Sequence, residues 1–186
     1  MPKALSSQLQ PASIGLALAV LTILLGQFLG ILFGLNEDII KDHLEASAIQ
    51  VRETAYQGDQ AAMDKVLGKS WSYMKRAHLH AGSMGTTATL LIIVVSLLGV
   101  SRLTTQLTSL ALGGGGLGYS LFWMWAGFRA PGMGGTGAAK ESLRLLAMPT
   151  SGSFVLASVA VLVLVVMASL KPGPKAPEKS WPDGKE

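Results

Sequence analysis

The chain of 186 residues contains no cysteine. This excludes disulfide bonds, thiolate zinc sites, iron–sulfur clusters and cysteine nucleophiles. Charged residues are also scarce, at 14% of the sequence, whereas a soluble domain carries about 25%. The formal net charge of +4 is small, and the basic residues form no stripe interleaved with aromatics, so no nucleic-acid partner is expected.

Long apolar runs take the place of the missing charge. A helix rises about 1.5 Å per residue, so about 20 apolar residues cross a hydrocarbon core of about 30 Å. The sequence therefore predicts an all-α integral membrane protein, a four-helix bundle in the lipid bilayer. The four predicted spans are residues 13–35, 81–100, 103–128 and 153–170. The first run continues into Asn36 without a small-residue cleavage site, which indicates a spanning helix rather than a cleaved signal peptide.

The segments between the spans have their own patterns. Residues 1–12 are interpreted as a cytoplasmic leader, and residues 171–186, rich in proline and charge, as a disordered tail. Residues 129–150 are predicted to be a loop with a short amphipathic helix, 138–148, that stops before Pro149. Residues 36–80 are predicted to be an extramembrane helical hairpin between the first and second spans.

Capping residues set the expected limits of that hairpin. Asn36 is a good N-cap, and apolar residues then recur at three- and four-residue steps, which is typical of an amphipathic helix. Gly58 is expected to end this helix, and Asp59 to cap the next one. The hairpin should then lead to the second span.

Small residues mark the expected helix contacts. Gly85 belongs to a stripe of small and polar residues in the second span, which is how helices pack in lipid. The third span contains four consecutive glycines, Gly113, Gly114, Gly115 and Gly116. Each weakens a helix by about 1 kcal/mol relative to alanine, so we expect either an interruption or close packing of another backbone.

The positive-inside rule suggests an orientation. With both termini cytoplasmic, the inner side holds Lys3, Arg102 and the four lysines after residue 170. The hairpin, which carries most of the acidic residues, then lies outside. We interpret the location as a bacterial inner membrane.

Two of the three histidines lie where the hairpin meets the second span. His78 and His80 are two residues apart, and each residue turns a helix by about 100°. Their side chains should therefore point about 200° apart and cannot chelate one ion together. Each could instead face a different ligand or helix.

The run Ala77-His78-Leu79-His80, followed by Ser83-Met84-Gly85, resembles the haem-ligating helix of subunit I of the heme-copper oxidases. The resemblance covers this short stretch and implies that His78 and His80 are axial haem ligands. The family needs several more histidines for its copper and second haem, whereas this chain has only His43 left. What the resemblance leaves is a single haem b.

Other residues complete this haem hypothesis. The second axial ligand could be His43, a methionine such as Met63, Met84 or Met124, or a partner subunit, and Lys75 and Arg76 could pair with the propionates. The alternatives are that the pair binds copper or another metal, or that it is an interfacial residue pair without a ligand. A solvated role is the favoured interpretation for His43.

Three functions remain open. The chain could be an accessory subunit of a membrane complex, of the respiratory electron-transfer kind, with other membrane subunits or copies of itself as partners and a haem b as cofactor. It could be a purely structural or assembly subunit. It could be a small transporter or channel lined by the polar start of the third span, residues 104–108. Catalysis by this chain alone is not expected.

Overall fold

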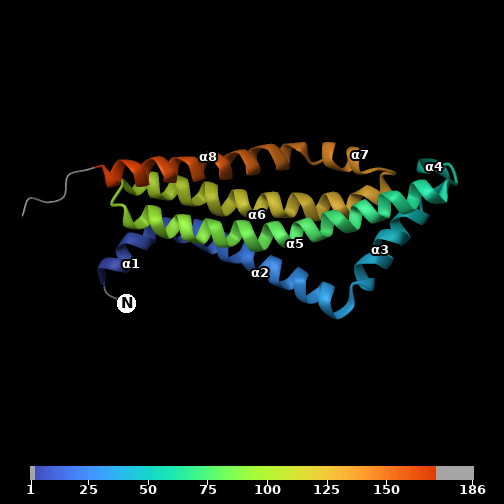
Figure 1. Ribbon diagram of the computed structural model, residues 1–186, viewed down its shortest axis with the longest axis horizontal. Coiled ribbons are helices and arrows are strands. Elements are labelled where there is room, and N and C mark those ends of the chain that lie inside the picture. The colour runs from blue at the N-terminus through green and yellow to red at the C-terminus, as the bar shows by residue number, and fades with distance from the viewer. Residues whose placement is uncertain (1–2, 171–186) are drawn as a thin grey trace, which may run out of the picture.

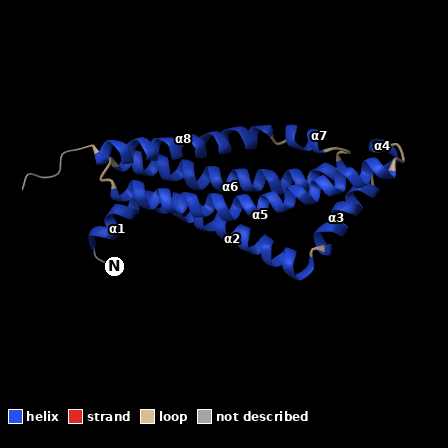
Figure 2. Cartoon of the chain, viewed as in Figure 1, coloured by secondary structure: helices blue, strands red, loops and turns tan. Residues whose placement is uncertain are grey.

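The computed structural model describes residues 3–170, which are helical apart from short turns (Figures 1 and 2). The tail predicted for residues 171–186 and the first two residues of the leader lie outside this range. The all-α prediction is confirmed for the described part, in which no strand occurs. In chain order the elements are α1 (Lys3–Leu9), the 3-10 helix η1 (Gln10–Ala12), α2 (Ser13–Asn36), α3 (Asp38–Ile49), α4 (Arg52–Ala55), α5 (Gln60–Leu97), α6 (Arg102–Gly132), α7 (Thr136–Glu141) and α8 (Arg144–Ser169).

Three described helices are long and apolar enough to cross a membrane: 6–36, which contains α2, together with α5 and α8. Helix α6 is not among them, because its many glycine, serine and threonine residues lower its mean hydropathy. It is nevertheless the central helix, since it packs against α2, α5 and α8. Figure 1 shows α5, α6 and α8 running side by side along the molecule.

The first half of the chain differs from the sequence prediction at its helix ends. The predicted cap at Asn36 is wrong, because Asn36 is the last residue of α2 and Glu37 separates α2 from α3. The helix after it ends at Ile49 and not at Gly58, and the short α4 follows. Asp59 does cap the next helix, since its side chain accepts a hydrogen bond from the backbone N–H of Ala62.

That next helix, α5, continues without a break from Gln60 to Leu97. The expected boundary between residues 80 and 81 is therefore no end of a helix. The amphipathic segment before residue 80 and the apolar segment after it belong to one continuous helix of 38 residues. This helix is about 57 Å long at 1.5 Å per residue. Gly99, with a φ of 66°, makes the turn into α6.

The second half also departs from prediction at a proline. Pro149 was expected to stop a short helix, but α8 begins at Arg144 and runs through Pro149. Pro149 is the sixth residue of α8, so the helix continues there without one backbone N–H···O bond. The predicted helix 138–148 is replaced by α7 and the start of α8.

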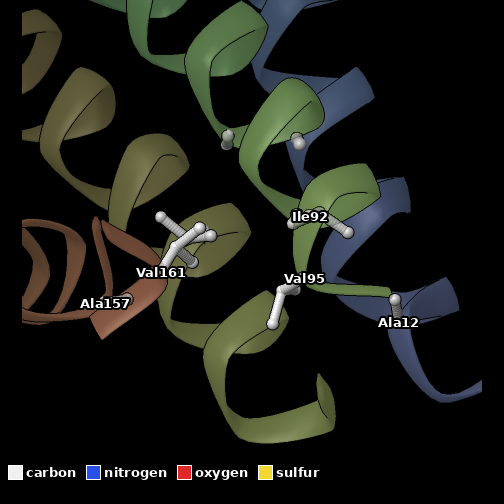
Figure 3. Close-up of a cluster of buried hydrophobic side chains, with 8 residues drawn as sticks. Ala12, Ile92, Val95, Ala157 and Val161 are labelled. Carbon is white, nitrogen blue, oxygen red and sulfur yellow. The ribbon is translucent and has the colours of Figure 1, made fainter. Parts of the chain in front are cut away.

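The largest cluster of buried apolar side chains lies where η1, α2, α5, α6 and α8 meet, and includes Ala12, Ile92, Val95, Leu112 and Val161. Figure 3 shows Ile92 and Val95 of α5 between Ala12 on one side and Ala157 and Val161 of α8 on the other. A second cluster joins α3 and α5 through Ile40, Leu44 and Met74. The first cluster fixes the bundle, and the second attaches α3 to it.

Candidate functional site

The two histidines of α5 point to different neighbouring helices, as their spacing predicts. The ring of His78 lies against α2, where it contacts Phe33 with ring centroids 5.8 Å apart. The ring of His80 lies against α6, where it contacts Tyr119 at 5.3 Å and Trp123 at 6.0 Å. Both side chains are half-buried. The two imidazoles therefore do not form one binding site.

The position of His78 is set by two glycines of α2. Its Nδ1 lies 2.8 Å from the backbone oxygen of Gly26, and a carbonyl oxygen only accepts, so Nδ1 donates. Gly30 leaves room for the ring, because a Cβ there would lie 2.7 Å from the Cε1 of His78. A histidine that donates from Nδ1 to a backbone carbonyl keeps Nε2 as its electron-pair donor, which is the arrangement of many ligating histidines.

Around His80 there is an aromatic cluster, which we define as Tyr73, Tyr119, Phe122 and Trp123. Their rings contact one another at centroid distances of 4.9 to 6.1 Å. The guanidinium of Arg76, one turn before His80, lies 4.9 Å from the ring centre of Trp123 and 5.5 Å from that of Tyr73. The indole nitrogen Nε1 of Trp123 is buried and has no hydrogen-bond partner in the part of the chain that the structure describes.

His43 lies apart from this pair, on the exposed side of α3. Its ring meets that of Phe128 edge-on at 5.6 Å. Both side chains line a cavity of about 500 Å³ between α2, α3 and α6. The other lining residues are Phe28, Leu29, Leu32, Ile39, Ile40 and Met124. Of the groups suggested as axial ligands, the fold thus brings together His43 and Met124.

The three histidines differ in the space and in the possible second ligand that their surroundings offer to a haem. Within residues 6–170 no group of three or more His, Asp or Glu side chains could hold a metal ion. At His78 and His80 one side of each ring packs against a neighbouring helix, against Phe33 in one case and against the aromatic cluster in the other, and both side chains are half-buried. The apolar cavity at His43 has an imidazole and a thioether on its walls, and both are haem ligands in cytochromes.

Four of the five glycines expected at helix contacts do lie against another helix. A Cβ at Gly113 would lie 2.1 Å from the backbone oxygen of Gly15 in α2, and one at Gly85 would lie 2.9 Å from the backbone nitrogen of Ile23. A Cβ at Gly115 would lie 2.7 Å from the oxygen of Thr150 in α8, whereas at Gly116 the contacts are ordinary. The fifth, Gly114, has only a side-chain carbon of Leu18 at 4.0 Å. Close packing, and not an interruption, is the outcome at the glycine run.

The polar start of α6 has satisfied hydroxyl groups. Thr105 donates to the backbone oxygen of Ser101, and Ser109 to that of Gln106. Thr105, Thr108 and Ser109 are buried against neighbouring helices. Three of these hydroxyl side chains thus face neighbouring helices, and the lining of a path by this segment stays a prediction.

Among the described residues outside the apolar helices, two side chains, Lys41 and Tyr56, have a pKa above its ordinary value. The hydrogen bond that the Nζ of Lys41 donates to the carboxylate of Glu37, one turn earlier at the turn between α2 and α3, raises the pKa of Lys41. Burial raises the pKa of Tyr56, whose hydroxyl donates to the backbone oxygen of Pro131 at 2.7 Å. The Tyr56 contact joins the segment after α4 to the end of α6.

Sequence reasoning named Arg76 but not the aromatic cluster as its neighbour. The signal was present, because Tyr119 and Trp123 are four residues apart, as are Arg76 and His80, and residues at this spacing share a helix face. What the spacing could not give was that these two faces meet. Comparison of the chain with protein-family models, curated proteins and solved structures found no match.

Proposed function

We propose that this chain is an accessory subunit of a larger membrane complex, of the respiratory electron-transfer kind, and that it holds its place there by packing rather than by catalysis. The observation that supports this is the role of α6. Its smallest residues are used to bring α2, α5 and α8 together, with Gly113 against Gly15 and Gly115 against Thr150. The centre of the bundle is thus filled by helix contacts.

The proposal includes four membrane crossings. Helix α6 follows α5 after a turn of four residues and has 31 residues, about 46 Å at 1.5 Å per residue. It lies beside α5 and α8 (Figure 1), so it has to cross whatever they cross. Its glycines and hydroxyls are shielded from lipid by the three apolar helices. Helices α3 and α4, with the first turns of α5, then form the outer extramembrane part, and both termini are cytoplasmic.

The outer faces of the bundle suit lipid or the helices of another subunit. Exposed aliphatic side chains cover α2 and α8, among them Leu21, Leu24, Leu156 and Leu162. Interfaces inside membranes are made by such apolar and small side chains. The partner proposed is therefore another set of membrane helices.

Co-purification tests the accessory role. The tagged chain, extracted from its own membranes in mild detergent, should bring down one or more membrane subunits in fixed proportion. The variant Gly113→Ala, which moves α2 away from α6, should lower that proportion, while Gly114→Ala should not. Recovery of the wild-type chain alone as a stable monomer would overturn the proposal.

A haem b is the second candidate, supported by the cavity that has His43 and Met124 on its walls and by the Nε2 of His78, which the Gly26 contact leaves as an electron-pair donor. When bound, the haem would supply one-electron transfer. His43, His78 or His80 would hold its iron, and Arg76 a propionate.

An absorption spectrum tests this candidate. Protein purified from haem-replete cells should show a Soret band. The band should be lost in whichever of His43→Ala, His78→Ala and His80→Ala removes a ligand. Met167→Ala, on the exposed face of α8, serves as the control. A colourless wild-type protein would end the haem hypothesis and leave the accessory role untouched.

A further inference from the structure

Arg76 is an exposed cation that has no acidic partner within residues 3–170. Among the described residues, ion pairs join Lys41 to Glu37 and Arg144 to Glu141, and none includes Arg76. Its guanidinium instead lies over the rings of Trp123 and Tyr73. Such cation–π contacts fix the plane of the guanidinium without neutralising its charge. The charge is therefore held in place and available to an anion from outside the chain.

The surroundings of Arg76 place that anion at the membrane surface. Lys75 is exposed beside it, and the aromatic cluster has the composition of an interfacial belt. One turn further along α5, Leu79 is 62% exposed, and Ser83 follows on the same side of the helix and is also exposed. A cationic group is thus followed by a strip of uncharged surface that leads into the apolar part of the helix.

We propose that Arg76 and Lys75 bind the phosphate of an anionic phospholipid, whose acyl chain lies along the strip that starts at Leu79. The guanidinium presents two parallel N–H donors, which match two phosphate oxygens. The rings of Trp123 and Tyr73 reduce the freedom that Arg76 loses on binding, because its side chain is already ordered. The inference concerns the membrane-facing surface and does not depend on the proposed accessory role. It uses the guanidinium that the haem candidate gives to a propionate, so the two assignments of Arg76 exclude each other.

Native mass spectrometry of the purified protein tests the site. Protein incubated with equal amounts of phosphatidylglycerol and phosphatidylcholine should retain phosphatidylglycerol in preference. Arg76→Gln should reduce that preference about fivefold, which corresponds to the ~1 kcal/mol per basic residue typical near an anionic surface. Arg52→Gln removes the same charge from the exposed α4 and should leave the preference unchanged.

Two further measurements distinguish lipid binding at Arg76 from a general effect of positive charge and from binding of free phosphate. Arg76→Lys keeps the charge but loses the planar guanidinium, so its preference for phosphatidylglycerol should fall between those of Arg76→Gln and the wild type. The lysine variant also replaces the glutamine variant in the test if the latter does not fold. Inorganic phosphate should stabilise the protein less than phosphatidylglycerol does. Equal losses in Arg76→Gln and Arg52→Gln, or equal stabilisation by inorganic phosphate, would overturn the proposal.

Discussion

At the scale of single residues, the absence of a side chain decides the closest contacts of this protein. Gly113 lets the backbones of α2 and α6 touch, and Gly30 accommodates the ring of His78. The sequence predicted close packing at the glycine run but not which glycine carries it. Neighbours in a run differ by 100° around the helix, so Gly113 faces Gly15 while Gly114 faces open space near Leu18.

This difference predicts opposite effects of two alanine substitutions. Gly113→Ala should lower the free energy of unfolding by about 1–3 kcal/mol, the usual cost of overpacking, because the new Cβ meets the backbone oxygen of Gly15. Gly114→Ala should leave stability unchanged or raise it by up to ~1 kcal/mol, since alanine favours the helix. Thermal unfolding in detergent, followed by tryptophan fluorescence, measures both. Equal midpoints for the two variants would show that the helices are not in backbone contact at Gly113.

For the two histidines of α5 as well, the sequence predicts the direction of each side chain, and the fold decides which residues it contacts. That His78 and His80 point in different directions follows from two residues of helix. That one of them donates to Gly26 and the other lies on Tyr119 depends on where α2 and α6 lie around α5. The role of either imidazole as a ligand stays a prediction.

At the scale of elements, α5 shows why helix boundaries were misjudged. The sequence changes from amphipathic to apolar near residue 80, which indicates a change in what the side chains contact. The backbone hydrogen bonds of a helix do not depend on that change, so α5 continues through it. Asp59, whose side chain accepts a hydrogen bond from the backbone N–H of Ala62 in the first turn, was recognisable from the sequence as the cap of this helix. Pro149 was likewise expected to end a helix, whereas α8 continues through it.

The segment between α4 and α5 is joined to the end of α6 by one buried hydrogen bond, from Tyr56 to Pro131. Tyr56→Phe should lower the free energy of unfolding at neutral pH by about 1 kcal/mol. Because burial raises the pKa of Tyr56 above its ordinary 10.0, the folded protein holds this proton more tightly than the unfolded chain. The contribution is therefore complete below pH 10 and is lost as the pH rises through the raised pKa.

Unfolding midpoints of the wild type and Tyr56→Phe, measured from neutral to strongly alkaline pH, check this prediction. The gap between the two proteins should close above pH 10. Tyr119→Phe serves as the control, since Tyr119 packs against other rings in the bundle. A gap that stays constant with pH would mean that the hydroxyl does not contribute through this contact.

At the scale of the whole molecule, the described part of the chain is an elongated bundle, and different helix ends and turns lie at its two extremes. Figure 1 shows α1, the turn from α5 to α6 and the end of α8 at one extreme, and α4 at the other. In a membrane this arrangement puts the turn at Ser101 and the helix at Glu53 on opposite sides. The absence of native cysteine makes the arrangement easy to test.

Single-cysteine variants should react from opposite sides. A membrane-impermeant maleimide added to intact cells should label Glu53→Cys, and should label Ser101→Cys only after the membrane is opened. The reversed pattern would keep the fold but contradict the orientation inferred from the lysines. Labelling of both variants from one side would contradict the bundle's placement across the bilayer.

The sequence by itself determined that this protein is helical and has segments suited to a membrane, because length and apolar composition decide whether a helix can cross the hydrocarbon core of a bilayer. It also determined the opposed directions of His78 and His80, which follow from the geometry of one helix. Only the tertiary structure decided that α6, the long described helix that is not apolar enough by itself to span a membrane, lies at the centre, that Arg76 rests on two aromatic rings, and that His43 shares a cavity with Met124. Each of these depends on which faces of separate helices meet, and that is settled by packing between residues far apart in the chain.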